Sequence, residues 1–326
     1  MKNRVLILKS DNDDFEKVFI KGFRQAGIDC HPIYKKTGRA GYYLRVLWNQ
    51  YLNLPYKSLT YGDWKDTLDQ YDTVILFDRI LSWDILKFIK RKNPHLRLIV
   101  WYWNPVDGSI SLPDPSYGAE VWSFNPTDCA VHSLKFNTQF YFQASNSNFQ
   151  KSGALKAESG HPEKLSGKPV AFFAGVDKGR AKEIIHLGDC LKKADAKLDF
   201  SIISDKNSSA DPENSSCYRS EKMAYGEILD RIRKADLLVD VPQAGQNGLT
   251  LRVLEAQFYH KKLLTTNPSV KDCCFYHPAN ILIMQEKTTL SELETFLHLP
   301  CNTESFEKAD YYSIPNWLER FNEGAV

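Results

Sequence analysis

The sequence lacks long apolar runs, a cysteine framework and an excess of one charge. No stretch of about 18 apolar residues occurs, which argues against a membrane-spanning helix. The apolar run near the N-terminus is too short for a signal-peptide core. Seven cysteines without a CxxC pair are typical of free thiols in a reducing compartment. These absences predict a cytoplasmic location, either free or resting on the cytoplasmic membrane.

Familiar catalytic motifs are also missing. GxGxxG, GxSxG, HExxH and the P-loop GxxxxGK[ST] do not occur, and the eight histidines show no ligand spacing. We therefore expect no metal site. The 42 Lys and Arg balance the 40 Asp and Glu, which predicts that nucleic acid is not a partner. Residues 1–165 nevertheless carry 22 − 17 = +5, so this half either faces an anionic partner or membrane, or holds scattered solvated lysines.

What the sequence does contain is a repeated alternation of strand and helix patterns over 326 residues. Such alternation predicts an α/β protein with mostly parallel sheets. The predicted strands are residues 5–8, 28–34, 73–77, 96–102, 120–124, 138–142, 169–174, 198–203, 236–241, 262–265 and 280–284. A Ser-, Gly- and Lys-rich stretch at 144–168 interrupts the pattern and is the best linker candidate. We expect two Rossmann-like doubly wound domains, residues 1–150 and 151–305, facing a central cleft.

Two glycine-containing loops in the second half follow predicted strands and precede predicted helices, which span residues 178–194 and 249–259. The first, FFAGVDKGR, offers Gly175 for close backbone approach and Lys178 and Arg180 as cations for a phosphate. A surface turn with solvated side chains explains this loop equally well.

The second loop, QAGQNGLTLRVLE, opens a helix that could point at a pyrophosphate. Its candidate donor-binding residues are Gln246, Gly248, Leu249, Thr250, Arg252 and Glu255. Glu255 lies roughly 7–10 Å along the helix from Gly248, a separation that suits a ribose held by a carboxylate. The alternative is an Arg252–Glu255 surface pair on a capped helix.

The N-terminal half offers weaker candidates. Asp13 follows the first strand and could serve as a general base, although a helix cap is the stronger interpretation. Arg39 and Tyr42, in the segment KKTGRAGYYLR, could bind an anionic sugar or lipid-linked acceptor, or simply open an amphipathic helix. The aromatic residues 101–103 suit either sugar stacking or, more commonly, a buried core.

The segments GVDKGR, QNGLTLRVLEAQFYHKKLLTTN, VWSFNPTDC and TQFYF together resemble bacterial GT-B glycosyltransferases of lipopolysaccharide and capsular polysaccharide assembly. The resemblance implies a nucleotide-sugar donor, with Lys178 and Arg180 at the diphosphate, residues 248–250 at the helix tip and Glu255 at the ribose. It also implies a saccharide or lipid-linked acceptor and no metal cofactor. Residues 306–326 would form a helix that returns to the N-terminal domain.

One departure from that family bears on stereochemistry. Retaining members often carry two glutamates eight positions apart, but Asn247 stands eight positions before Glu255. We therefore expect an inverting, metal-independent glycosyltransferase with Asp13 as its base. The alternatives are a nucleotide-sugar epimerase or a phosphorylase on the same fold, or a two-domain ligand-binding protein without catalysis.

Overall fold

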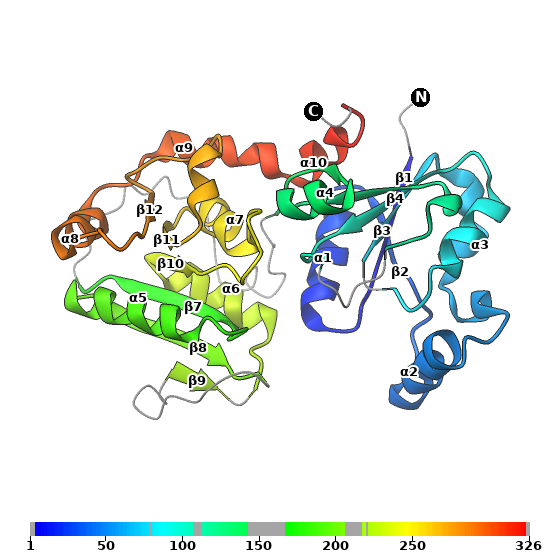
Figure 1. Cartoon of the computed structure of the whole chain (residues 1–326), viewed down its shortest axis with the longest axis horizontal. Coiled ribbons are helices and arrows are strands. Elements are labelled where there is room, and N and C mark those ends of the chain that lie inside the picture. Colours follow the sequence, from blue (N-terminus) through cyan, green and yellow to red (C-terminus); the bar gives the residue numbers. More distant parts are fainter. Residues whose placement is uncertain are drawn as a thin grey trace, which may run out of the picture. The chain divides into compact units, whose positions relative to one another are not determined.

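A computed structural model of the chain describes residues 4–78, 80–106, 112–142, 167–205, 217–219 and 221–323. The chain divides into two compact units (Figure 1). Unit 1 comprises Met1–Thr138 with Leu318–Val326, and unit 2 comprises Gln139–Trp317. The predicted domain boundary at residue 150 and nearly all of the predicted linker 144–168 lie outside the described residues.

Unit 1 is built on a six-stranded parallel sheet in the order β2-β1-β3-β4-β5-β6. Its strands are β1 (Val5–Lys9), β2 (Asp29–Pro32), β3 (Thr73–Phe77), β4 (Arg97–Tyr102), β5 (Ala119–Ser123) and β6 (Lys135–Phe136). Its helices are α1 (Asp14–Gln25), α2 (Arg39–Val46), α3 (Asp84–Lys92) and α4 (Pro126–His132). The central strand β3, TVILF, is buried at every position, as a strand covered on both faces must be.

The two faces of this sheet are covered by different helices. Leu76 and Val100 pack with Ile85 and Ile89 of α3. On the opposite face, Phe77 contacts Phe23 of α1 at 6.0 Å between ring centroids. Alternate residues of one strand therefore bury against different helices, which is the doubly wound arrangement.

Unit 2 repeats the plan with the strand order β12-β11-β10-β7-β8-β9. Its strands are β7 (Val170–Val176), β8 (Lys197–Ile203), β9 (Tyr218–Arg219), β10 (Leu237–Asp240), β11 (Lys262–Thr265) and β12 (Ile281–Ile283). Its helices are α5 (Ala181–Lys193), α6 (Tyr225–Lys234), α7 (Leu251–Phe258), α8 (Leu290–His298), α9 (Thr303–Glu307) and α10 (Ile314–Arg320). Two parallel six-stranded sheets with helices confirm the predicted α/β class of two Rossmann-like domains.

Three local predictions need correction. Residues 138–142 do not form a strand of the sheet, because the last strand is β6 and Tyr141 makes only an isolated bridge to Ser313. The apolar run there is buried for another reason: Phe140 packs on Trp317 at 4.3 Å between ring centroids. The helix predicted from Lys178 begins later, at Ala181, and the helix predicted from Leu249 begins at Leu251.

Within the part of the chain that the structure describes, no helix combines the length and apolarity needed to cross a bilayer.

Candidate functional site

The two glycine-containing loops of unit 2 lie against one another. They follow β7 and β10, which are parallel neighbours in the sheet. Lys178 donates from Nζ to Gln243 Oε1 at 2.6 Å, and Arg180 donates from Nη1 to the Val241 carbonyl. Because carboxyl ends of parallel strands are where ligands bind in such sheets, the predicted donor-binding residues gather at the expected edge.

The first loop is a tight turn that leaves Lys178 exposed. Lys178 and Gly179 both have positive φ, at 51° and 80°. Asp205 accepts the Lys178 backbone N–H at 3.0 Å, and Asp177 accepts the Ala181 N–H at 2.8 Å, where α5 begins. The left-handed backbone delays the helix and places the ammonium group beside the second loop.

Arg180 is bound to backbone carbonyls at both strand ends. Besides Val241, its guanidinium donates to the Val176 carbonyl at 3.1 Å and to the Asp177 carbonyl at 3.2 Å. A Cβ on Gly175 would lie 3.2 Å from Arg180 Nη2, so glycine leaves room for this arrangement. Burial lowers the pKa of Arg180. Arg180 thus joins two strand ends while keeping its charge beside the loop.

The second loop is held by a buried polar network that sequence reasoning missed. Thr250 is the N-cap of α7, and its hydroxyl donates to Asp240 Oδ1 at 2.7 Å. Thr265 donates to the other oxygen of Asp240 at 2.7 Å, and Asn267 Nδ2 donates to the Gly248 carbonyl at 3.2 Å. Burial raises the pKa of Asp240. A carboxylate at the end of the apolar run DLLVDV was the available signal.

The remaining loop residues take distinct positions. Gln246 is half-buried and closes a turn through its N–H to the Gln243 carbonyl at 3.1 Å. Gly248 and Leu249 are buried directly before the Thr250 cap. The helix tip is therefore preceded by backbone packed against the unit rather than by a free surface loop.

Glu255 lies in a buried hydrogen-bonded chain. Its side chain is 3% exposed and contacts Arg252 Nη1 at 2.7 Å. Tyr225 donates its hydroxyl to Glu255 Oε1 at 2.7 Å, and the hydroxyls of Tyr141 and Tyr225 are 2.8 Å apart. The Arg252–Glu255 pair exists, but it is not the surface pair considered as an alternative.

The electrostatics of this chain follow from its burial. Burial raises the pKa of Glu255, and the charge of Arg252 opposes that rise. Burial also holds the pKa of Tyr225 well above its ordinary value, so this phenol stays a neutral donor. Each carboxylate oxygen can accept more than one hydrogen bond, but Glu255 is closed to solvent by the side chains around it, and its predicted role at a ribose stays a prediction.

In unit 1, Asp13 is the N-cap of α1, and its Oδ1 accepts the Glu16 N–H at 2.9 Å. The capping interpretation is therefore what the structure shows, and a role as base stays a prediction. Beneath the cap lies an ion pair that sequence reasoning missed. Lys9 and Glu16 contact one another with both side chains 2% exposed, and Lys9 Nζ lies 3.9 Å from the Trp103 ring centroid.

The aromatic segment 101–103 is buried, which supports the core interpretation over sugar stacking. Arg39 is the exposed first residue of α2, and Tyr42 on the same helix packs on Tyr43 at 5.6 Å between ring centroids. Their predicted role in acceptor binding stays a prediction. Both belong to unit 1, as Asp13 does, whereas the predicted donor-binding residues belong to unit 2.

Across the described ranges, no three His, Cys, Asp or Glu side chains gather in an arrangement that could hold a metal ion.

No protein-family model and no curated protein matches the sequence. Solved structures do match. An alpha-glucosyltransferase in complex with UDP and a 13-mer DNA containing an HMU base is 12% identical, with 98% of both chains covered and a TM-score of 0.56. The alpha-glucosyltransferase with UDP and a 13-mer DNA containing a central A:G mismatch gives 12% identity, the same coverage and a TM-score of 0.51. Sucrose-phosphate synthase from Thermosynechococcus elongatus gives 10% identity over 99% of this chain and 98% of its own, with a TM-score of 0.47.

The comparison corrects one prediction. Two structures of the same fold hold DNA, which contradicts the expectation that nucleic acid is not a partner. A balanced total charge does not exclude a local basic surface, so whole-chain charge does not decide this point. The likeness extends over nearly the full length of both chains and establishes that this protein has the two-domain GT-B fold.

Proposed function

We propose that the protein is a glycosyltransferase that moves a sugar from a nucleotide-sugar donor to a saccharide or lipid-linked acceptor. The observation that carries this proposal is the meeting of the loop after β7, which carries Lys178 and Arg180, with the glycine-containing loop after β10. The structures with this fold that hold UDP support a nucleotide as part of the donor.

The donor would bind with its diphosphate at these loops. Lys178 is exposed, and its ammonium group, which donates to Gln243, is the cation that would meet a phosphate. Arg180 adds a fixed positive charge behind the loop. As the bond between the sugar and the diphosphate breaks, cations and the α7 N-terminus would stabilise the leaving nucleoside diphosphate without a metal ion.

The remaining roles are finer proposals. Glu255 would accept hydrogen bonds from the ribose after the side chains around it move. Asp13 would take the acceptor proton in an inverting displacement, and Arg39 and Tyr42 would contact the acceptor. Assembly of a surface polysaccharide is the biological role that the sequence resemblance implies.

Donor binding is tested by thermal unfolding with UDP, GDP, CMP and dTDP. A ligand that binds the folded protein at 100 times its Kd stabilises it by about 2.7 kcal/mol. Lys178→Ala should weaken that stabilisation at least tenfold in apparent Kd, whereas Lys182→Ala, an exposed lysine on α5, should not.

Transfer is tested with the nucleotide that binds, supplied as its sugar conjugate. The acceptor panel should include saccharides, lipid-linked saccharides and duplex DNA, because the matched structures hold DNA. Release of nucleoside diphosphate that depends on an acceptor supports the proposal. Conversion of the nucleotide-sugar without an acceptor indicates an epimerase, and tight binding without turnover indicates a binding protein; either result overturns the proposal.

A further inference from the structure

An exposed apolar surface lies on one short segment of unit 1. The helix α2 continues directly into a π-helical turn, Leu47–Tyr51, and a loop then leads to a 3-10 turn, Lys57–Thr60. We call the exposed apolar side chains of this segment, each 38–75% exposed, the α2 face. The α2 face consists of Tyr43, Leu44, Leu47, Trp48, Tyr51, Leu52, Tyr56 and Leu59.

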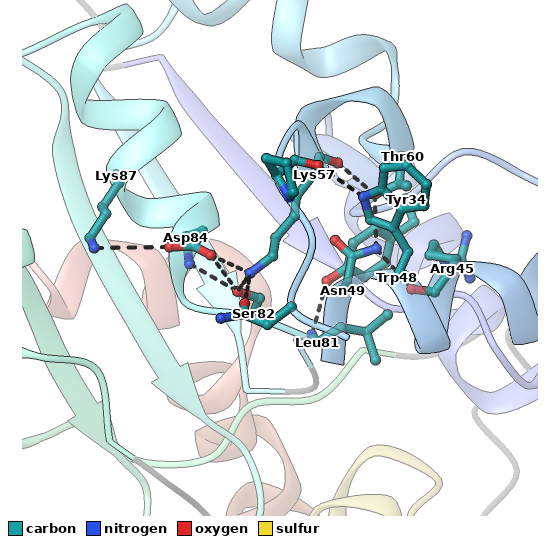
Figure 2. A network of polar contacts seen from close by, with 12 residues as sticks. Tyr34, Arg45, Trp48, Asn49, Lys57, Thr60, Leu81, Ser82, Asp84 and Lys87 are labelled. Carbon is teal, nitrogen blue, oxygen red and sulfur yellow. Dashed lines mark hydrogen bonds and ion pairs between the residues drawn. The ribbon is translucent and has the colours of Figure 1, made fainter. Parts of the chain in front are cut away.

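Two polar residues of this segment, Arg45 and Asn49, point inward. Arg45 is buried, donates to the Lys35 carbonyl at 2.8 Å and lies 4.8 Å from the Tyr34 ring centroid. Asn49 is buried too, and its Nδ2 donates to the Arg45 carbonyl at 2.9 Å. Figure 2 shows both side chains with Tyr34 and Thr60 inside this network. An amphipathic helix normally packs its apolar stripe on the domain, so the reversed orientation leaves that stripe for something else.

The loop after the helix is fixed by its own buried cation. Lys57 is buried and contacts Asn53, Ser82 Oγ at 2.9 Å and the Asp84 carboxylate (Figure 2). The hydrogen bond from Lys57 lowers the pKa of Asp84, which therefore stays ionised. Tyr56 has a left-handed φ of 59° while its side chain is 75% exposed. A bulky residue in the left-handed region is strained. The backbone conformation that holds Tyr56 outward therefore costs conformational free energy.

The charge around the α2 face identifies its partner. No Asp or Glu occurs between Asp29 and Asp63, and Lys35, Lys36 and Arg39 are exposed at the start of the helix. Leucines for insertion, Trp and Tyr for the headgroup region and flanking cations are the composition of an interfacial helix on an anionic membrane.

Other partners fit less well. A symmetric dimer through this face would bring identical cations of two copies together, because an isologous interface pairs a patch with itself. A nucleic acid would be contacted by the cations but would leave the exposed leucines in water. We propose that the α2 face docks unit 1 onto an anionic phospholipid bilayer.

The main experiment is vesicle flotation of the full chain without substrate, so its outcome does not depend on the proposed glycosyl transfer. Wild type should float with vesicles of equal parts phosphatidylcholine and phosphatidylglycerol, and less with phosphatidylcholine alone. Leu44→Gln with Tyr51→Gln should lower partitioning about a hundredfold, because two side chains lose their burial in lipid. The matched control, Val131→Gln with Leu290→Gln, changes two exposed apolar residues elsewhere and should float like wild type.

The charge contribution is tested separately. Lys35→Gln with Lys36→Gln should lower partitioning about fivefold per lysine removed. Lys182→Gln with Lys193→Gln makes the same charge change in unit 2 and should have little effect.

A third measurement uses the tryptophan fluorescence of the wild-type protein, with one variant as its control. Trp48 is 38% exposed and Trp83 is half-buried, whereas Trp64, Trp101, Trp103, Trp122 and Trp317 are buried. Brominated lipids should therefore quench Trp48, and Trp48→Phe should remove that quenching.

Three results would overturn the proposal. The first is failure of the wild type to bind anionic vesicles, or equal binding by the Leu44 and Tyr51 double variant. The second is a wild-type dimer, seen by light scattering, that the double variant loses, which would assign the face to a second copy. The third is duplex DNA binding that the double variant loses while vesicle binding is absent.

Discussion

Each unit holds a buried ion pair, but the two pairs are built differently: Lys9–Glu16 joins the end of β1 to α1, whereas Arg252 and Glu255 both lie on α7. Lys9 and Glu16 in unit 1 lie beneath aromatic rings, with Lys9 Nζ 4.4 Å from the Phe77 centroid. Arg252 and Glu255 in unit 2 are further bound, through the Ala174 carbonyl at 3.2 Å and through Tyr225. The first pair fastens α1 to β1, whereas the second connects α7 to β7 beside the candidate donor site.

The surroundings of the two ion pairs indicate which of them a ligand could affect. Burial lowers the pKa of Lys9, partly offset by Glu16, because the ammonium has little else to replace water. The carboxylate of Glu255 is contacted on both oxygens, by Tyr225 and by Arg252. The carboxylate of Asp240, which accepts from Thr250, lies close enough to affect the pKa of Glu255. We therefore expect changes in the first pair to affect stability and changes in the second to affect stability and donor binding together.

The largest expected effect comes from breaking the first pair. Lys9→Met leaves Glu16 buried without its cation, which should lower the free energy of unfolding of unit 1 by about 3–5 kcal/mol. Denaturant unfolding followed by tryptophan fluorescence measures this, because six of the seven tryptophans lie in unit 1.

Two controls sharpen that result. Lys9→Met with Glu16→Leu replaces both charges with apolar groups and should recover more than half of the loss. Lys17→Met breaks an exposed pair with Asp14 and should change stability little. A single Lys9→Met as stable as the wild type would show that the pair does not hold α1.

The next effect concerns pH and the second pair. Because burial raises the pKa of Glu255 above 4.5, the folded state binds more protons than the unfolded state, and stability falls as pH rises from about 4.5 through the folded pKa. Each unit of pKa difference contributes about 1.4 kcal/mol. Glu255→Gln should reduce this fall, leaving the similar contribution of Asp240, and thermal unfolding across pH measures it.

Glu120 in unit 1 should give the opposite pH dependence of stability. It is partly buried, which favours its neutral form, but hydrogen bonds from Arg97 and Lys135 lower its pKa to about 2. The contribution of Glu120 to the free energy of unfolding is present above pH 4.5 and is lost as the pH falls towards 2. Glu120→Gln should therefore reduce the loss of stability at acid pH. If Glu255→Gln also reduced the loss of stability at acid pH, the assignment of a raised pKa to Glu255 would be wrong.

The smallest expected effect comes from the tyrosines behind Glu255. Tyr225→Phe removes one hydrogen bond to the carboxylate and should cost about 1 kcal/mol, with weaker nucleotide binding. Tyr141→Phe removes only the far end of the chain and should cost less. A double-mutant cycle on unfolding and on nucleotide affinity separates the two contributions; equal effects of both variants on affinity would contradict the order proposed.

The order of helices and strands was largely predictable from the sequence. Runs such as TVILF and KLLT, at 73–77 and 262–265, are apolar throughout because both faces of a parallel strand are buried. The gathering of the loops after β7 and β10 was predictable too, since neighbouring parallel strands end at one edge. Strand predictions failed where apolar residues are buried for another reason. At residues 138–142 the apolar run is buried by aromatic packing and not by a sheet.

The side-chain pairing at the site was not predictable. Tyr225 is 30 residues from Glu255, and no local pattern marks it as a partner. The sequence of segment 35–45 fits either an acceptor-binding loop or an ordinary amphipathic helix. The structure shows a helix, but one with Arg45 and Asn49 turned inward.

Local apolar periodicity thus decided the α/β class, the order of elements and the placement of both glycine loops at strand ends, since those depend only on which residues must avoid water. Tertiary packing alone decided which charged side chains are buried, which groups contact the oxygens of Glu255 and which side of α2 faces outward. Those outcomes depend on partners distant in the chain, whose desolvation is offset only when the folded backbone brings them within hydrogen-bonding distance.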